Sequence, residues 1–177
     1  SFPFDGDYDD DDAAKAAAFG SLNQSAVSGG QPAALFIGNT GIATYDAASA
    51  YQSLGGLYDG ARGATAQLYA DIGRSLAYDL REVARVIYGV EQNVMDVNAR
   101  FFQVSNGGYD THSDQGGAEP NGQHFSLHAE LGAALKVFYD DLASMPGNVA
   151  NRVCVLVWSE FSRRIPQNQN GTDHGSQ

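Results

Sequence analysis

The sequence has one cysteine, few basic residues and no long apolar segment, and each shortage excludes a class of protein. Cys154 cannot form a disulfide within the chain, and because it lies in an apolar run we interpret it as a small core residue. Ten basic residues against 21 acidic ones give a formal net charge of −11. This balance argues against nucleic acid and against an anionic membrane surface as partners. The apolar runs are too short for a transmembrane segment, and no signal peptide is visible.

The length and apolar content indicate one globular domain preceded by an acidic arm. The chain has 177 residues, of which 43% are hydrophobic, enough to bury a core. Residues 1–12 hold a run of aspartates, but the positions of the glycine and the acidic residues do not fit a calcium-binding EF-hand loop. We therefore predict a solvated arm over residues 1–12 and a single domain over 13–177. A calcium-dependent surface protein is the weaker alternative.

Hydrophobic periodicity predicts two long helices and two buried strands in the second part of the chain. Apolar residues recur at spacings of three and four over Ala64–Gln92 and over His124–Ser144, which is typical of amphipathic helices. Short apolar runs at Val97–Ser105 and Val153–Trp158 are typical of strands buried on both faces. Before residue 64 the periodicity is weak, with a short helix over Ala13–Phe19 and a short strand or extended segment over Ala33–Ile37 as options.

The order strand, helix, strand predicts an α/β fold with a mainly parallel sheet and a right-handed crossover. The loops that follow the two strands would then leave the same edge of the sheet, which is where open α/β sheets bind ligands. Polar residues are concentrated in these loops and in the Gly-Thr-Asp-His-Gly segment that follows. They are Asp110, His112, Glu160, Asp173 and His174.

Carboxylates and imidazoles gathered at one edge predict a divalent-metal site, and this mixture points to zinc, manganese or iron rather than calcium. Arg163 and Arg164 are candidates for holding an anionic group by bidentate hydrogen bonds. Ser159 and Thr172 are possible nucleophiles, but neither has an evident base beside it, so the catalytic residue stays unassigned. Taken alone, each of these residues is more typical of an ordinary loop, and only their concentration at one predicted edge favours a site.

Two further histidines have plainer interpretations. His128 falls on the apolar face of the second predicted helix and is typical of a core or interface histidine. His124 stands at the start of that helix, where an exposed loop residue is the simple reading.

Three motifs follow one another in a recognisable order: Gly-Gly-Tyr-Asp-Thr-His at 107–112, the helix Leu127–Leu142, and Ser-Glu-Phe at 159–161 followed by Gly-Thr-Asp-His-Gly at 171–175. Together they resemble a bacterial family of unknown function, DUF1501, which is grouped with the alkaline phosphatase and sulfatase-like superfamily. The resemblance covers about residues 64–177.

The resemblance implies a three-layer α/β/α sandwich, hydrolysis of phosphate or sulfate esters, and export from a bacterial cell. It also implies that the five carboxylate and imidazole residues named above are the metal ligands. The family's Gly-Gly-Asn-Asp-Ser-like segment, where a nucleophile is expected, is missing, and Ser162 replaces the usual glycine. We therefore expect part or a shortened relative of a metal-dependent ester hydrolase. The alternative is a non-catalytic accessory or structural subunit, with a protein partner or the missing remainder of the domain covering the sheet edges.

Overall fold

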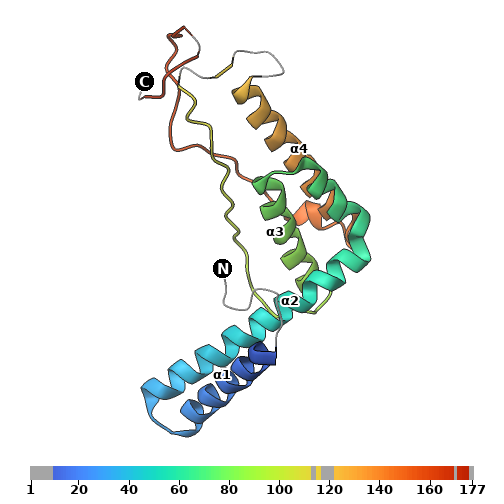
Figure 1. Ribbon diagram of the computed structural model, residues 1–177. Coiled ribbons are helices and arrows are strands. Elements are labelled where there is room, and N and C mark those ends of the chain that lie inside the picture. Colours follow the sequence, from blue (N-terminus) through green and yellow to red (C-terminus); the bar gives the residue numbers. More distant parts are fainter. Residues whose placement is uncertain (1–9, 113–114, 117–121, 170, 176–177) are drawn as a thin grey trace. The chain divides into compact units, whose positions relative to one another are not determined.

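The computed structural model describes residues 10–112, 115–116, 122–169 and 171–175. Its elements are α1 (Asp10–Ser28), α2 (Pro32–Ile72), α3 (Ser75–Glu91), α4 (Gln123–Ser144) and a short 3₁₀ turn, η1 (Val149–Arg152) (Figure 1). The chain divides into two compact units, Ser1–Leu54 and Gly55–Gln177, and each is described by itself. No helix within the described residues combines the length and the apolar character needed to cross a bilayer. The predicted acidic arm lies mostly outside these residues, and Asp10–Asp12 begin α1.

The first unit contains a hairpin of α1 and the first part of α2, and small residues let the two helices approach closely. A Cβ atom on Gly41 would lie 2.1 Å from Oδ1 of Asn23, and one on Gly38 would lie 2.6 Å from the Asn23 carbonyl oxygen. Asn23 is 9% exposed, and its amide donates to the carbonyl of Phe19 at 2.8 Å. The glycines that weaken helix propensity here therefore make the helix contact possible.

In the second unit, the predicted helix over Ala64–Gln92 is two helices. Gly73 has a φ of +67°, a left-handed conformation that glycine adopts without a steric penalty and that commonly ends a helix. It ends α2, and α3 begins two residues later. The second predicted helix is confirmed, since α4 begins one residue before His124 and ends at Ser144, just before Pro146 and Gly147.

A buried ion pair joins α2 to α4. Arg62 departs from helical geometry inside α2 (φ −134°, ψ 27°), and its Nε donates to Oδ1 of the fully buried Asp141 at 2.7 Å. The hydroxyl groups of Tyr58 and Tyr69 donate to the other carboxylate oxygen. Burial, followed by the interaction with Asp141, raises the pKa of both phenols, so both stay protonated and able to donate.

The apolar core surrounds this polar network. Because the carboxylate of Asp141 has donors on both oxygens, its burial is compensated. The side chains that fill the space between the end of α2, α3, α4 and η1 include Leu76, Leu80, Ala84, Phe138, Leu142 and Val149.

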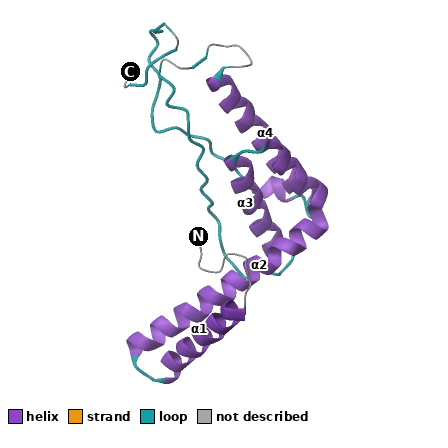
Figure 2. Ribbon diagram, viewed as in Figure 1, coloured by secondary structure: helices purple, strands orange, loops and turns teal. Residues whose placement is uncertain are grey.

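The predicted α/β sandwich with a mainly parallel sheet is wrong, because the described residues form helices and loops without any strand (Figure 2). Val97–Ser105 and Val153–Trp158 run as extended chain. Val104, Val153 and Val155 pack against the helical core, but a strand also requires a neighbour about 4.8 Å away whose backbone completes a ladder. An apolar run indicates that its residues tend to be buried, but it does not specify whether they lie in a helix or in a strand.

Outward-facing residues of the two extended segments stay exposed, contrary to the prediction of strands buried on both faces. Phe101 is 96% exposed, Leu156 81% and Trp158 69%. Cys154, which we had interpreted as a core residue, is also exposed, because it alternates with the inward-facing Val153 and Val155. Ala33–Ile37, one option for a strand, belongs to α2.

The ion pair predicts a large difference between two neighbouring aspartates of α4. Asp141→Ala leaves the Arg62 guanidinium, which is 10% exposed, without its carboxylate, and we expect it to lower the free energy of unfolding by about 3–5 kcal/mol. Asp140→Ala removes only an exposed pair with Lys136 and should change that free energy by less than about 1 kcal/mol. Urea denaturation followed by circular dichroism measures both, and equal effects would contradict the assigned role of the buried network.

Candidate functional site

The segment from Ser162 to Gly175 folds back on itself and presents the Asp-His pair. Arg163 and His174 form an isolated antiparallel bridge. The amide of Arg164 donates to the carbonyl of Asp173 at 2.8 Å, and the amide of Gly175 donates to the carbonyl of Ser162 at 3.0 Å. These hydrogen bonds fix the backbone at Asp173 and His174, and with it the directions in which the two side chains project.

Arg163 ties this folded segment to the Gly-Gly-Tyr-Asp-Thr-His segment more than 50 residues earlier. Its guanidinium donates to the carbonyl oxygens of Thr172 and Tyr109 and, at 3.1 Å, to the hydroxyl oxygen of Thr111. Thr111 is only 6% exposed, so alternation along the chain directs its neighbours Asp110 and His112 outward. A single cation therefore aligns the two segments through their backbone and a buried hydroxyl.

Gln115 and Gly171 bring the two segments into close contact. The side-chain oxygen of Gln115 accepts a hydrogen bond from the amide of Thr172 at 2.7 Å. A Cβ atom on Gly171 would lie 2.5 Å from both that side-chain oxygen and the carbonyl oxygen of His112. Position 171 therefore has room only for glycine.

These contacts bring Asp110, His112 and His174 together. Oδ1 of Asp110 lies 2.9 Å from Nε2 of His112 and 3.4 Å from Nε2 of His174, and the two imidazole rings are 4.6 Å apart. One ligand atom from each of the three residues lies within 4.8 Å of the other two. The side chains are 40–55% exposed, so the cluster is open to solvent. His112 has a φ of 42°, an uncommon conformation for a residue with a side chain.

Asp173 contacts His112 from the other side of its ring. Its Oδ1 lies 3.4 Å from Nδ1 of His112, the nitrogen opposite the one that faces Asp110. The side-chain amide of Asn168 donates to the same oxygen at 3.3 Å. A carboxylate in this position orients the imidazole and fixes its tautomer. Asp173 is therefore placed as the orienting partner of His112.

The donor atoms of the cluster are of the kinds that could hold a transition-metal ion. Tetrahedral zinc with bonds of about 2.0–2.1 Å has ligand atoms roughly 3.3 Å apart, close to the separations of Asp110 Oδ1 from the two imidazole nitrogens. Two imidazoles and a carboxylate suit zinc or manganese better than calcium, which prefers oxygen ligands. Asp110, His112 and His174 would hold the ion, and Asp173 would orient His112.

Other predicted site residues lie elsewhere or make other contacts. Glu160 is not part of the group whose ligand atoms lie within 4.8 Å of one another, among the residues that the structure describes. Arg163 is occupied by the backbone contacts described above. Arg164 is exposed and lies over Gly175, where a Cβ atom would come within 2.8 Å of its Nε. Anion binding by either arginine stays a prediction.

The sequence analysis missed the residues that hold the two segments together. Thr111, Gln115 and Gly171 have no chemical signature of a metal site, and only the position of Thr111 and Gly171 inside the motifs pointed to them. Their roles come from pairings across more than 50 residues, which no local pattern reveals.

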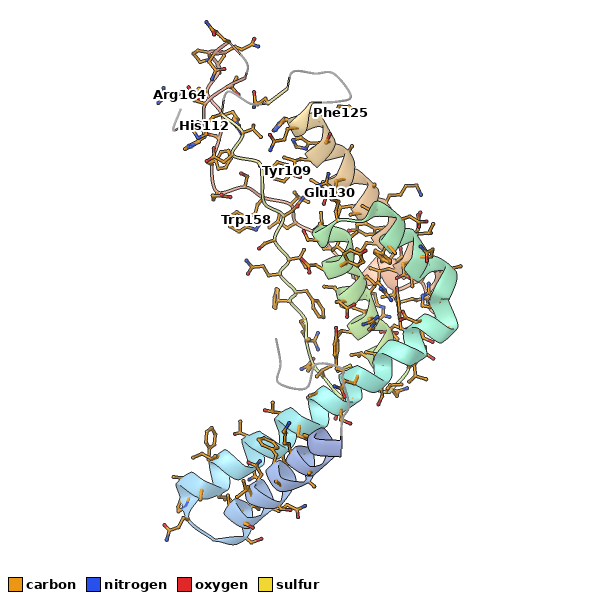
Figure 3. The ribbon with its side chains drawn as sticks, in the orientation of Figure 1. Tyr109, His112, Phe125, Glu130, Trp158 and Arg164 are labelled. Carbon is orange, nitrogen blue, oxygen red and sulfur yellow. The ribbon has the colours of Figure 1, made fainter. Side chains whose placement is uncertain are left out.

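The rings of His124 and His128, at the start of α4, pack edge-on against the ring of Tyr109, which Figure 3 labels beside α4. The Tyr109 hydroxyl donates to the carbonyl of Leu127 at 3.0 Å, and so fixes the extended segment against α4. Burial, together with the nearby His128 and Arg163, lowers the pKa of His124, which favours its neutral form. His128 is exposed beside another histidine, so it is not a core residue, and the alternative of an interface histidine stays a prediction.

One family model, described as "Protein of unknown function (DUF1501)", matches residues 90–177 of the chain. The match supports the family that the motifs suggested, and the DUF1501 segment contains every residue of the cluster. No curated protein and no solved structure matches the chain.

The close contact at Gly171 predicts a strong effect of one methyl group. Gly171→Ala should displace Asp173 and His174 from His112, because the added Cβ atom would overlap the His112 carbonyl oxygen. We expect altered imidazole signals of His112 and His174 in long-range ¹H–¹⁵N NMR spectra. Proteolysis of the segment from Ser162 to Gly175 should be about tenfold faster or more, which corresponds to a decrease of about 1.4 kcal/mol in the free energy of local opening. Gly132→Ala is the matched control, since a Cβ atom there meets nothing within 4 Å. Unchanged imidazole signals in the Gly171 variant would show that the contact does not hold the loop.

Proposed function

We propose that the chain supplies the divalent-metal site of a hydrolase of phosphate or sulfate esters, as part or a shortened relative of such an enzyme. The observation that carries the proposal is the convergence of Asp110 and His112 with His174, which lies more than 60 residues later in the sequence. The DUF1501 match adds support, because the motifs that resembled the family contain these residues. Ancestry in the alkaline phosphatase and sulfatase-like superfamily, and export from a bacterial cell, belong to the same proposal.

Each residue near the cluster has a definite task in this proposal. When bound, a divalent metal ion would polarise a phosphoryl or sulfuryl oxygen or activate a water molecule. Asp110, His112 and His174 hold the ion, and Asp173 keeps Nε2 of His112 turned toward it. Arg164, whose backbone is paired with Asp173, is the exposed cation proposed to hold an anionic ester.

The hydroxyl groups of Ser159 and Thr172, the two possible nucleophiles, are engaged in other contacts. Ser159 Oγ donates to the carbonyl of Phe161 at 3.1 Å, and Thr172 Oγ1 faces the side chain of Gln115. In the proposed reaction a water molecule therefore attacks the ester, and no side chain is assigned the role of nucleophile.

Metal binding tests the proposal directly. After incubation with Mn²⁺ and dialysis, elemental analysis should find one equivalent in the unaltered protein and none in His174→Ala or Asp110→Ala. Asp173→Asn should weaken binding about 10- to 100-fold, as expected when the orienting partner of a ligand is removed. Glu160→Gln should keep the metal, and its loss would return Glu160 to the ligand set. Equal Mn²⁺ content in His174→Ala and the unaltered protein would contradict the site.

Turnover is the second part of this test. The Mn²⁺- or Zn²⁺-loaded protein should hydrolyse 4-nitrophenyl phosphate or 4-nitrophenyl sulfate, and His174→Ala should reduce the rate to that of the buffer. Metal binding without turnover of either ester would reject the hydrolase and retain the metal site.

The exposed apolar side chains favour a second candidate, a non-catalytic accessory or structural subunit. Phe101, Leu156 and Trp158 lie on extended segments at 69–96% exposure, and exposed apolar side chains that form a contiguous patch commonly mark protein interfaces. The covered surface would be these extended segments, since the sheet edges that we first expected to need a partner are not formed.

Association in solution tests this second candidate. We expect the chain to self-associate above about 100 μM in light-scattering chromatography. Association would bury exposed apolar surface, and each Å² buried contributes about 25 cal/mol of favourable free energy. Leu156→Ser with Trp158→Ser should restore a monomer, whereas Leu22→Ser, at an exposed leucine of α1, should not. A monomer at millimolar concentration without any substitution would count against an accessory role.

A further inference from the structure

His124 and His128 form a second pair of metal-ligating side chains. They lie four residues apart at the start of α4, so they share a face of the helix. Nε2 of His124 is 3.2 Å from Nε2 of His128, and the ring centroids are 4.6 Å apart with the planes nearly perpendicular. The two Nε2 atoms are therefore close enough for both to bond to one ion.

The separation of these nitrogen atoms suits coordination to one ion. Zinc bonds to imidazole nitrogen at about 2.0–2.1 Å, and two ligands at tetrahedral angles are then roughly 3.3 Å apart. A hydrogen bond between one protonated and one bare nitrogen accounts for the same distance, so distance alone does not choose between a chelate and a hydrogen-bonded pair.

The surroundings leave Nε2 as the nitrogen of His124 that reaches a ligand. Nδ1 of His124 is buried and has no hydrogen-bond partner among the described residues. The ring of Tyr109 lies 6.4 Å from His124 and 5.4 Å from His128, with its plane nearly perpendicular to both. The Tyr109 hydroxyl is held by Leu127 and Asn106, so this aromatic wall is fixed against the pair.

We propose that His124 and His128 chelate one late transition-metal ion of the copper, nickel and zinc group through their Nε2 atoms. This site is separate from the Asp110, His112 and His174 cluster, since neither histidine belongs to that group. Imidazole nitrogen suits these three ions, whereas manganese binds such ligands more weakly. Two protein ligands leave the remaining positions to water or to an added ligand. The proposal does not depend on the hydrolase assignment.

The test uses tag-free full-length protein that carries H112A/H174A, so that the first cluster cannot bind. Calorimetric titration with Ni²⁺ should show one remaining equivalent. Adding H128A/A129H keeps the number of histidines but turns one imidazole away from the shared face, and we expect at least a tenfold loss of Ni²⁺ affinity. Circular dichroism of each variant checks that α4 persists.

Electron paramagnetic resonance of bound Cu²⁺ supplies a readout that does not rely on the relocated histidine. In the H112A/H174A protein, hyperfine splitting from two imidazole nitrogens supports the chelate. A signal from oxygen ligands alone, or Ni²⁺ affinity that is unchanged by H128A/A129H, overturns it. Mn²⁺ binding to the unaltered protein reports only on the first cluster, so failure of one site is distinguishable from failure of the other.

Discussion

The hydrogen bonds of Arg163 are the constraint on which the candidate site depends. Its guanidinium joins the carbonyl oxygens of Tyr109 and Thr172 and the hydroxyl of Thr111, and thereby fixes two distant loop segments without a sheet between them. Arginine suits this task because its donors point in several fixed directions from one planar group. The cluster geometry therefore depends on backbone acceptors and a buried threonine, while Asp110, His112 and His174 remain accessible.

The sequence selected residues that converge better than it predicted the architecture that brings them together. Asp110, His112 and His174 were selected because carboxylates and imidazoles recur in motifs flanked by glycine, and these three do converge. The reason first given for convergence, a shared edge of a parallel sheet, was wrong. Arg163 and Gln115 hold the segments together instead, and contacts of that kind between remote residues have no local signature.

The helices show what periodicity can and cannot predict. The span of α4 followed closely from its apolar repeat and the Pro-Gly that ends it. The long helix α2 was missed because its glycines, serines and threonines lower helix propensity, although Gly38 and Gly41 are the positions where Asn23 packs. Buried polar contacts such as Arg62 with Asp141 were likewise invisible, since either residue alone reads as surface charge.

The exposure of Cys154 makes the chain convenient to study with a single spectroscopic probe. It is the only thiol in the sequence, and it lies on the outer side of an extended segment whose inner side rests on the helices. A fluorophore or spin label attached there would sit beside Leu156 without replacing any residue of either histidine cluster. Its mobility and solvent accessibility would report when something covers that surface, and would do so independently of metal content.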